Sequence, residues 1–122
     1  MLLVGSSAQQ QRQYFEADKL REGLDYEVNP EHARNSTDRF SGAFALGYVN
    51  GVAENGYVNG VVDNSQNYAF CLNPGQVSQA VIGYTVYEYL TDHPEQLQKS
   101  RSMVTVAALE NAYPCPKEGP KK

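Results

Sequence analysis

The 122-residue chain contains no tryptophan, and it has only two cysteines and two histidines. His32 and His93 form no metal-binding spacing with each other, with a cysteine or with paired carboxylates, so we expect no metal site. No apolar run approaches the roughly 20 residues that a membrane helix needs, so we expect no membrane span. The length suits one domain with a modest core.

Positive charge is also scarce, with 10 Lys and Arg against 14 Asp and Glu. Nucleic-acid binding needs clustered basic residues, so that class of partner is excluded. The glycines lack the following Lys-Ser/Thr of a phosphate-binding loop, and we expect no cofactor. Glu88, Asp92 and Glu95 are typical of a solvated helix face rather than of a general acid/base pair. We therefore expect a protein that is not an enzyme and has no catalytic residue.

Cys71 and Cys115 each lie at a turn signal beside a helix-like segment, which predicts one intrachain disulfide. Such a bond would remove unfolded-state entropy worth about 4 kcal/mol. It would persist only in an oxidising compartment. The alternative is two unrelated buried thiols, and Cys71 with His93 as its base would then be a candidate nucleophile.

The two ends of the chain differ from its middle. Residues 1–8 combine a short apolar run with small residues before a cut after Ala8, as at the end of a secretory signal peptide. A positively charged start is missing, so a disordered lead is the alternative. We expect residues 9–116 to form a single helical domain and the basic tail, 117–122, to be disordered.

Apolar spacing predicts a first helix over about 12–25, which Pro30 and its neighbours end. Ser36-Thr37-Asp38 offers an N-cap for a second helix, which extends from Arg39 to about Asp63. An apolar stripe recurs every four residues in it: Phe40, Phe44, Tyr48 and Val52.

Glycines interrupt this second helix, and each costs about 1 kcal/mol in a helix interior, so we expect another backbone to pack closely there. The segment Gly47–Val52 recurs as Gly56–Val61, with a period of nine that places the copies on opposite helix faces. We expect the helix to continue through the first copy and to bend or end near Asn55-Gly56 or Asp63-Asn64. A β-hairpin that turns at Asn55-Gly56 is the alternative.

A third helix over Gln76–Asp92, begun by Pro74 and Ser78, has a wide apolar face that is typical of a central, mostly buried helix. That face consists of Val77, Val81, Ile82, Tyr84, Val86, Tyr87, Tyr89 and Leu90. Its β-branched and aromatic content leaves a strand as the alternative. His93-Pro94 ends it, and a last helix, capped by Ser100 or Ser102, extends to Ala112.

From about Phe40 to Pro116 the sequence resembles the Rap/Tai family of immunity proteins, which are small periplasmic inhibitors of peptidoglycan amidase effectors delivered by type VI secretion. The matching segments occur in the family's order, with the cysteines in the corresponding places: Gly47–Val52, Phe70–Gly75, Tyr89–Leu97 and Ala107–Cys115. The chain departs from the family in the second copy of the repeat, which leaves the geometry of residues 53–69 open.

The resemblance implies an all-α fold, a compact bundle of about four to five helices with a Cys71–Cys115 disulfide. It also implies residence in the periplasm and a cognate cell-wall amidase effector as partner, whose active-site cleft the protein blocks without chemistry of its own. A homodimer is compatible with it.

Two short loops are the candidates for insertion into such a cleft. Helices pinned by a disulfide present rigid loops, and rigidity lowers the ordering cost of binding. Acidic and amide groups there can engage a catalytic His or Cys of an amidase, although both loops also fit ordinary solvated connections. The candidate contact residues are Asp63, Asn64, Gln66, Asn67 and Tyr68 in the first loop and Asp92, His93 and Glu95 in the second.

Two other functions are compatible with the same residues. A small periplasmic chaperone or stress protein would expose apolar surface and bind many clients weakly. A structural envelope protein would have no client. An immunity protein would bind one hydrolase tightly.

Overall fold

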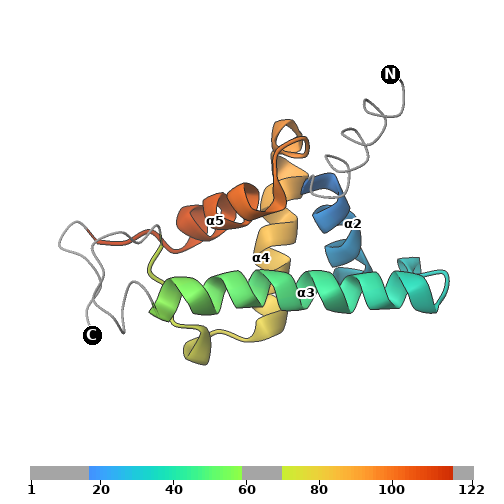
Figure 1. Cartoon of the computed structure of the whole chain (residues 1–122), viewed down its shortest axis with the longest axis horizontal. Coiled ribbons are helices and arrows are strands. Elements are labelled where there is room, and N and C mark those ends of the chain that lie inside the picture. Colours follow the sequence, from blue (N-terminus) through green and yellow to red (C-terminus); the bar gives the residue numbers. More distant parts are fainter. Residues whose placement is uncertain (1–16, 59–69, 117–122) are drawn as a thin grey trace, which may run out of the picture.

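The computed structural model describes residues 17–58 and 70–116. In these two ranges the chain forms four α-helices and short 3-10 turns, which confirms the predicted all-α fold (Figure 1). The helices are α2 (Ala17–Val28), α3 (Ser36–Tyr57), α4 (Gln79–Asp92) and α5 (Arg101–Ala112). The expected signal-like segment 1–8 and the tail 117–122 lie outside the described residues. No described helix combines the length and apolar character that crossing a bilayer requires.

Helix α4 stands between α2 and α5, and α3 crosses in front of it (Figure 1). All four helices contribute to one apolar core. The fully or nearly fully buried side chains include Leu20, Leu24, Val49, Phe70, Leu72, Ile82, Val86, Leu90, Val104 and Leu109.

Helix α2 ends at Val28, three residues beyond the predicted end, and the 3-10 turn η1 (Pro30–His32) follows it. Its first backbone amides are bonded across the fold. Ala17 N–H donates to the Lys99 carbonyl at 2.8 Å, and Asp18 N–H donates to the Leu97 carbonyl at 3.0 Å. These bonds satisfy amides that have no partner within their own helix, and they fasten α2 to the α4–α5 connection.

Helix α3 is capped by Asn35, whose side chain accepts from the Asp38 N–H at 2.9 Å. The N-cap therefore lies one residue before the predicted Ser36, because the amide oxygen of Asn35 reaches the third residue of the helix. The helix continues through the first repeat copy and ends at Tyr57, near the first of the two predicted positions. Asn55 and Gly56 are helical, so the hairpin alternative is wrong.

Two of the packed glycines let α2 and α3 approach closely. A Cβ at Gly23 would lie 2.9 Å from the Ser41 carbonyl oxygen, and one at Gly42 would lie 3.2 Å from the Tyr26 Cβ. Gly56 packs in the same way under the ring of Phe70. Of the glycines predicted to pack against another backbone, Gly42 and Gly56 are closely packed, but against side-chain atoms, and a Cβ at Gly47 or Gly51 would meet nothing within 4 Å.

Helix α4 begins at Gln79, three residues after the predicted start at Gln76, because Pro74–Gln76 form a separate 3-10 turn. Ser78 is its N-cap, and the Ser78 hydroxyl accepts from the Val81 N–H at 3.1 Å. Its buried residues are Ile82, Gly83, Val86 and Leu90. The predicted apolar face was too wide, because Val81 and Tyr84 are 49% and 48% exposed. Helices α2 and α3 cover a narrower part of the α4 surface than the sequence pattern suggests. One side of the first turns of α4 therefore stays exposed to solvent.

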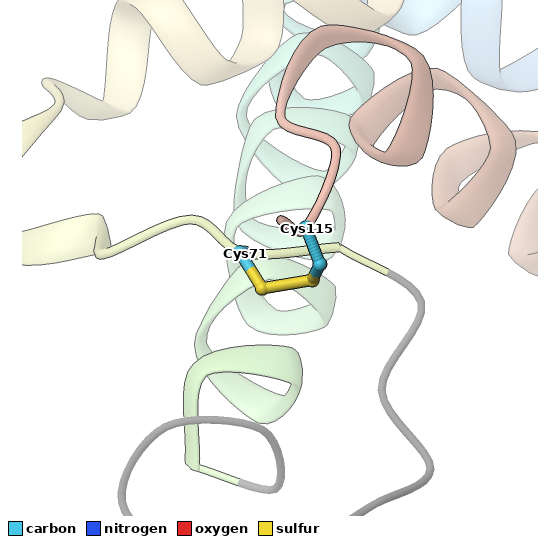
Figure 2. The surroundings of a disulfide bond; sticks show 2 residues. All are labelled: Cys71 and Cys115. Carbon is cyan, nitrogen blue, oxygen red and sulfur yellow. A yellow bond between two sulfur atoms is a disulfide. The ribbon is translucent and has the colours of Figure 1, made fainter. Parts of the chain in front are cut away.

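The predicted disulfide is present between Cys71, which precedes η3 (Pro74–Gln76) and α4, and Cys115, which follows α5 (Figure 2). The Cys71 N–H also donates to the Tyr113 carbonyl at 2.8 Å. The bridge therefore fastens the segment before α4 to the end of α5. Because both sulfurs are in this bond, Cys71 is not a free nucleophile.

Candidate partner-binding surface

The predicted turn at Asp92–Glu95 is a rigid corner at the end of α4. The His93 ring stacks on Tyr89 with centroids 4.2 Å apart, and its Nδ1 lies 2.8 Å from the Tyr89 carbonyl oxygen. The 3-10 turn η4 (Pro94–Gln96) then reverses the chain. Asp92 and Glu95 are exposed on this corner, whereas His93 is half-buried and builds it. The corner thus presents two carboxylates on a fixed backbone.

The outer face of α4 extends this negative charge toward the middle of the molecule. Tyr84, Glu88 and Asp92 lie four residues apart and share one helix face, and all three are exposed. The Tyr84 hydroxyl donates to Glu88 Oε2 at 3.3 Å. The negative charge of Glu88 raises the pKa of Tyr84 above its ordinary value, with smaller contributions from this hydrogen bond, burial and Asp92. The α4 outer face is therefore a negatively charged surface.

A hollow of about 380 Å³ opens beside this face, between α2, α3 and α4. On the α4 side it is bordered by Ala80, whose small exposed side chain leaves room there. Leu46 fills the position of a side chain at Gly83, since a Cβ there would lie 2.5 Å from its Cδ1. The lining is mostly apolar: Leu24, Glu27, Val28, Leu46, Ala80, Gly83 and Tyr84.

Glu27 is the only charged residue in that lining. Its side chain lies across Gly42, with Oε1 3.2 Å from the position of a Cβ there. Glu27 is exposed. Within residues 17–58 and 70–116 its carboxylate forms no ion pair or side-chain hydrogen bond. An apolar hollow with one carboxylate, next to the negatively charged α4 outer face, suits a ligand with an apolar body and a positive end.

The structure does not describe the first of the two predicted contact loops. Asp63, Asn64, Gln66, Asn67 and Tyr68 lie outside the described residues. Sequence reasoning named Asp92 and Glu95, which are exposed on one corner, and did not name Glu27 or the hollow. The available signal was Gly83 inside an apolar helix, which marks a place where a neighbouring side chain approaches the backbone.

A separate row of exposed apolar side chains follows the outer side of α3. Phe40 and Phe44 are 71% and 52% exposed. The Arg101 guanidinium of α5 lies over the rings of Phe44 and Tyr48, at 5.8 and 4.6 Å from their centroids. The stripe noted in the sequence is therefore a surface feature at its first two residues, while Ala45, Val49 and Ala53 face the core.

No group of three or more His, Cys, Asp or Glu suited to a metal ion occurs among the described residues. A polar cluster joins Asp25, Asn29, His32 and Tyr87, and it connects α2, η1 and α4 rather than lining the hollow.

Comparison with known proteins agrees with this description. A search of curated proteins found no match. The model of one protein family, the Rap1a immunity proteins, matches residues 16–115, which include all four described helices and both cysteines. The match covers most of the chain, and the chain therefore belongs to the Rap1a immunity protein family.

Proposed function

We propose that this chain is a periplasmic immunity protein that binds and blocks the active-site cleft of a peptidoglycan amidase effector delivered by type VI secretion. The observation that carries this proposal is the family match over residues 16–115. Immunity requires recognition rather than catalysis, and a disulfide-linked helical scaffold with exposed charged corners is suited to it.

The Cys71–Cys115 bond supports the periplasmic location. Structural disulfides persist in oxidising compartments such as the bacterial periplasm and are rare in the reducing cytosol. An effector that attacks peptidoglycan acts in that same compartment, so inhibitor and effector would meet there.

The Asp92–Glu95 corner is the best placed of the described candidates for contact with the cleft. Its backbone is fixed by η4 and by the Tyr89–His93 stack, so little conformational entropy is lost on binding. Carboxylates on this corner can accept hydrogen bonds from a catalytic imidazole. The loop residues Asp63 to Tyr68 are proposed as a second contact on their amide and acidic character alone.

The test is capture of partners by the mature protein from a lysate of its source organism, followed by mass spectrometry and peptidoglycan-hydrolysis assays. One stoichiometric amidase that is inhibited on binding would support the proposal. Glu95→Ala and Asn67→Ala should weaken inhibition without unfolding the protein, and Glu110→Ala on α5 is the matched control. An amidase that binds but stays fully active would contradict the blocking mechanism.

A second function, a chaperone for envelope proteins, is favoured by the exposure of Phe40 and Phe44. Large exposed apolar side chains mark interaction sites. In the same capture experiment a chaperone would retain many envelope proteins weakly. That result would replace the immunity proposal.

For the exposed row of Phe40 and Phe44 on α3, we propose that a second copy of the chain covers it, rather than client proteins. Phe40, Phe44, Gly47 and Gly51 share the exposed face of α3. If two α3 helices pack antiparallel about a two-fold axis, Phe40 faces Gly51 and Phe44 faces Gly47, so each ring meets bare backbone. Sedimentation should show a dimer that Phe40→Ser dissociates, whereas Met103→Ser on α5 should not. A monomeric wild-type protein at high concentration would contradict this proposal.

A further inference from the structure

The hollow between α2, α3 and α4 has a floor suited to an aliphatic chain. Val28, Leu46 and Ala80 supply apolar surface that is at least partly accessible, and behind them lie the buried Leu24 and Gly83. About 380 Å³ is enough room for one extended side chain. The neighbouring Val81 and Tyr84 are about half exposed, so apolar surface continues beyond the rim.

The charge at the mouth is negative on two sides. Glu27 of α2 contributes a carboxylate that is not engaged by another described side chain. On the α4 side, the Tyr84 hydroxyl is bonded to Glu88. No Lys or Arg lines the hollow. An anionic or purely apolar group would leave Glu27 uncompensated, whereas a cation would neutralise it.

We propose that this hollow is the anchor site for a lysine or arginine side chain of the effector. Its methylene groups would lie on Leu46, Ala80 and Tyr84, and its cationic end would pair with Glu27 at the mouth. Long basic side chains combine an apolar stem with a charged end, which is the combination this site offers. The inference rests on the proposed immunity function, because it assigns that function's partner a docking residue.

The position of the hollow fits this role. Tyr84 belongs both to the hollow and to the α4 outer face, which continues through Glu88 to Asp92 and the Asp92–Glu95 corner. An effector held at the corner would therefore have the hollow within the same continuous surface. Side chains seated in well-packed pockets of an interface are the ones that contribute most of the binding energy.

The first test uses n-butylguanidinium as a stand-in for the side chain, with amide NMR shifts of the full chain as the readout. We expect saturable shifts at millimolar probe, centred on Ala80 and Gly83. Glu27→Gln should weaken probe binding by fivefold or more, and Ala80→Leu, which fills the hollow, should abolish it. Glu54→Gln on α3 is the matched charge control. Butyrate, the anionic counterpart, should cause no shifts there.

Unperturbed Ala80 and Gly83 amides, or equal binding by Glu27→Gln, would overturn the proposal without using an effector. This readout is independent of whether capture yields an amidase, so failure of the proposed function is recognised separately. With an amidase in hand, Glu27→Gln and Ala80→Leu should each reduce affinity tenfold or more. Ala43→Leu, a matched change on the exposed side of α3, should not. Unchanged affinity in the first two variants would also overturn the proposal.

Discussion

The Tyr87 hydroxyl donates a 2.8 Å hydrogen bond to Asp25 Oδ1 and so connects α4 to α2. The same carboxylate accepts from the Asn29 side chain at 2.9 Å, and its Oδ2 lies 2.7 Å from Nδ1 of His32. One partly buried carboxylate thus joins two helices and η1. Because α2 and α4 also line the hollow, this cluster helps to hold the two sides of the candidate surface together.

Removal of the Tyr87 hydroxyl should destabilise the fold. A hydrogen bond to a charged group contributes about 1.5–3 kcal/mol, and Asp25 keeps its other partners, so we expect Tyr87→Phe to cost about 1.5 kcal/mol. Urea unfolding measures this loss. Tyr84→Phe is the matched control, because the Tyr84 hydroxyl bonds at the exposed surface, and its effect should be much smaller. Equal losses in the two variants would contradict the special role of Tyr87.

The contact between His32 and Asp25 should make stability depend on pH. The hydrogen bond to Asp25, aided by the charges of Asp25 and Glu31, raises the pKa of His32 above 6.5. That contribution is fully present below pH 6.5 and is lost as the pH rises through the raised value. Burial alone would raise the pKa of Asp25, but bonds from His32, Asn29 and Tyr87 outweigh it and lower the pKa below 3.8. The Asp25 contribution is therefore lost only in acid.

The pair should accordingly contribute most between about pH 4 and pH 6.5. We expect the difference in unfolding free energy between wild type and His32→Gln to be largest in that window and to shrink toward pH 8. Urea unfolding at several pH values measures it. A difference that is constant from pH 5 to pH 8 would show that His32 acts through its neutral form alone.

Loss of the disulfide should lower stability more than loss of any single hydrogen bond. The bond joins residues 44 apart, for which loop-closure entropy corresponds to about 4 kcal/mol. Cys71→Ala combined with Cys115→Ala should lower the melting temperature markedly, and a reductant should do the same to wild type but not to the double variant. Two free thiols in the intact mass of protein taken from the periplasm would contradict both this prediction and the proposed location.

Local signals predicted most of the fold. Ser78 and Ser100 cap α4 and α5, Pro30 and Pro94 lie in the turns that follow helices, and the two cysteines pair as expected. The caps and turns depend on a few neighbouring residues. The disulfide depends on the cysteine count, because two cysteines allow only one intrachain pairing. The N-cap of α3 was placed one residue late because Asn35 and Ser36 are both good caps, and only the backbone geometry distinguishes them.

The candidate site was only half predictable. The charges of Asp92 and Glu95 at a turn can be read locally. The hollow cannot, because it depends on how Glu27 of α2, Leu46 of α3 and Gly83 of α4 meet across the fold. Helical periodicity shows that α4 has an apolar side, but the packing of neighbours decides how much of that side is covered.

The two kinds of glycine in this fold should respond oppositely to alanine. At Gly23 a Cβ would lie 2.9 Å from the Ser41 carbonyl oxygen and 2.8 Å from the Ala45 Cβ, so α2 and α3 would have to separate. We expect Gly23→Ala to cost about 1–3 kcal/mol through overpacking. At Gly51 a Cβ meets nothing within 4 Å, and helix propensity alone should stabilise Gly51→Ala by about 1 kcal/mol. Urea unfolding of the monomer at low concentration measures both changes. Gains in stability in both variants would contradict the close α2–α3 crossing.

Sedimentation of Gly51→Ala at high concentration tests the proposed dimer. A methyl group at position 51 would meet Phe40 of the second copy and weaken association.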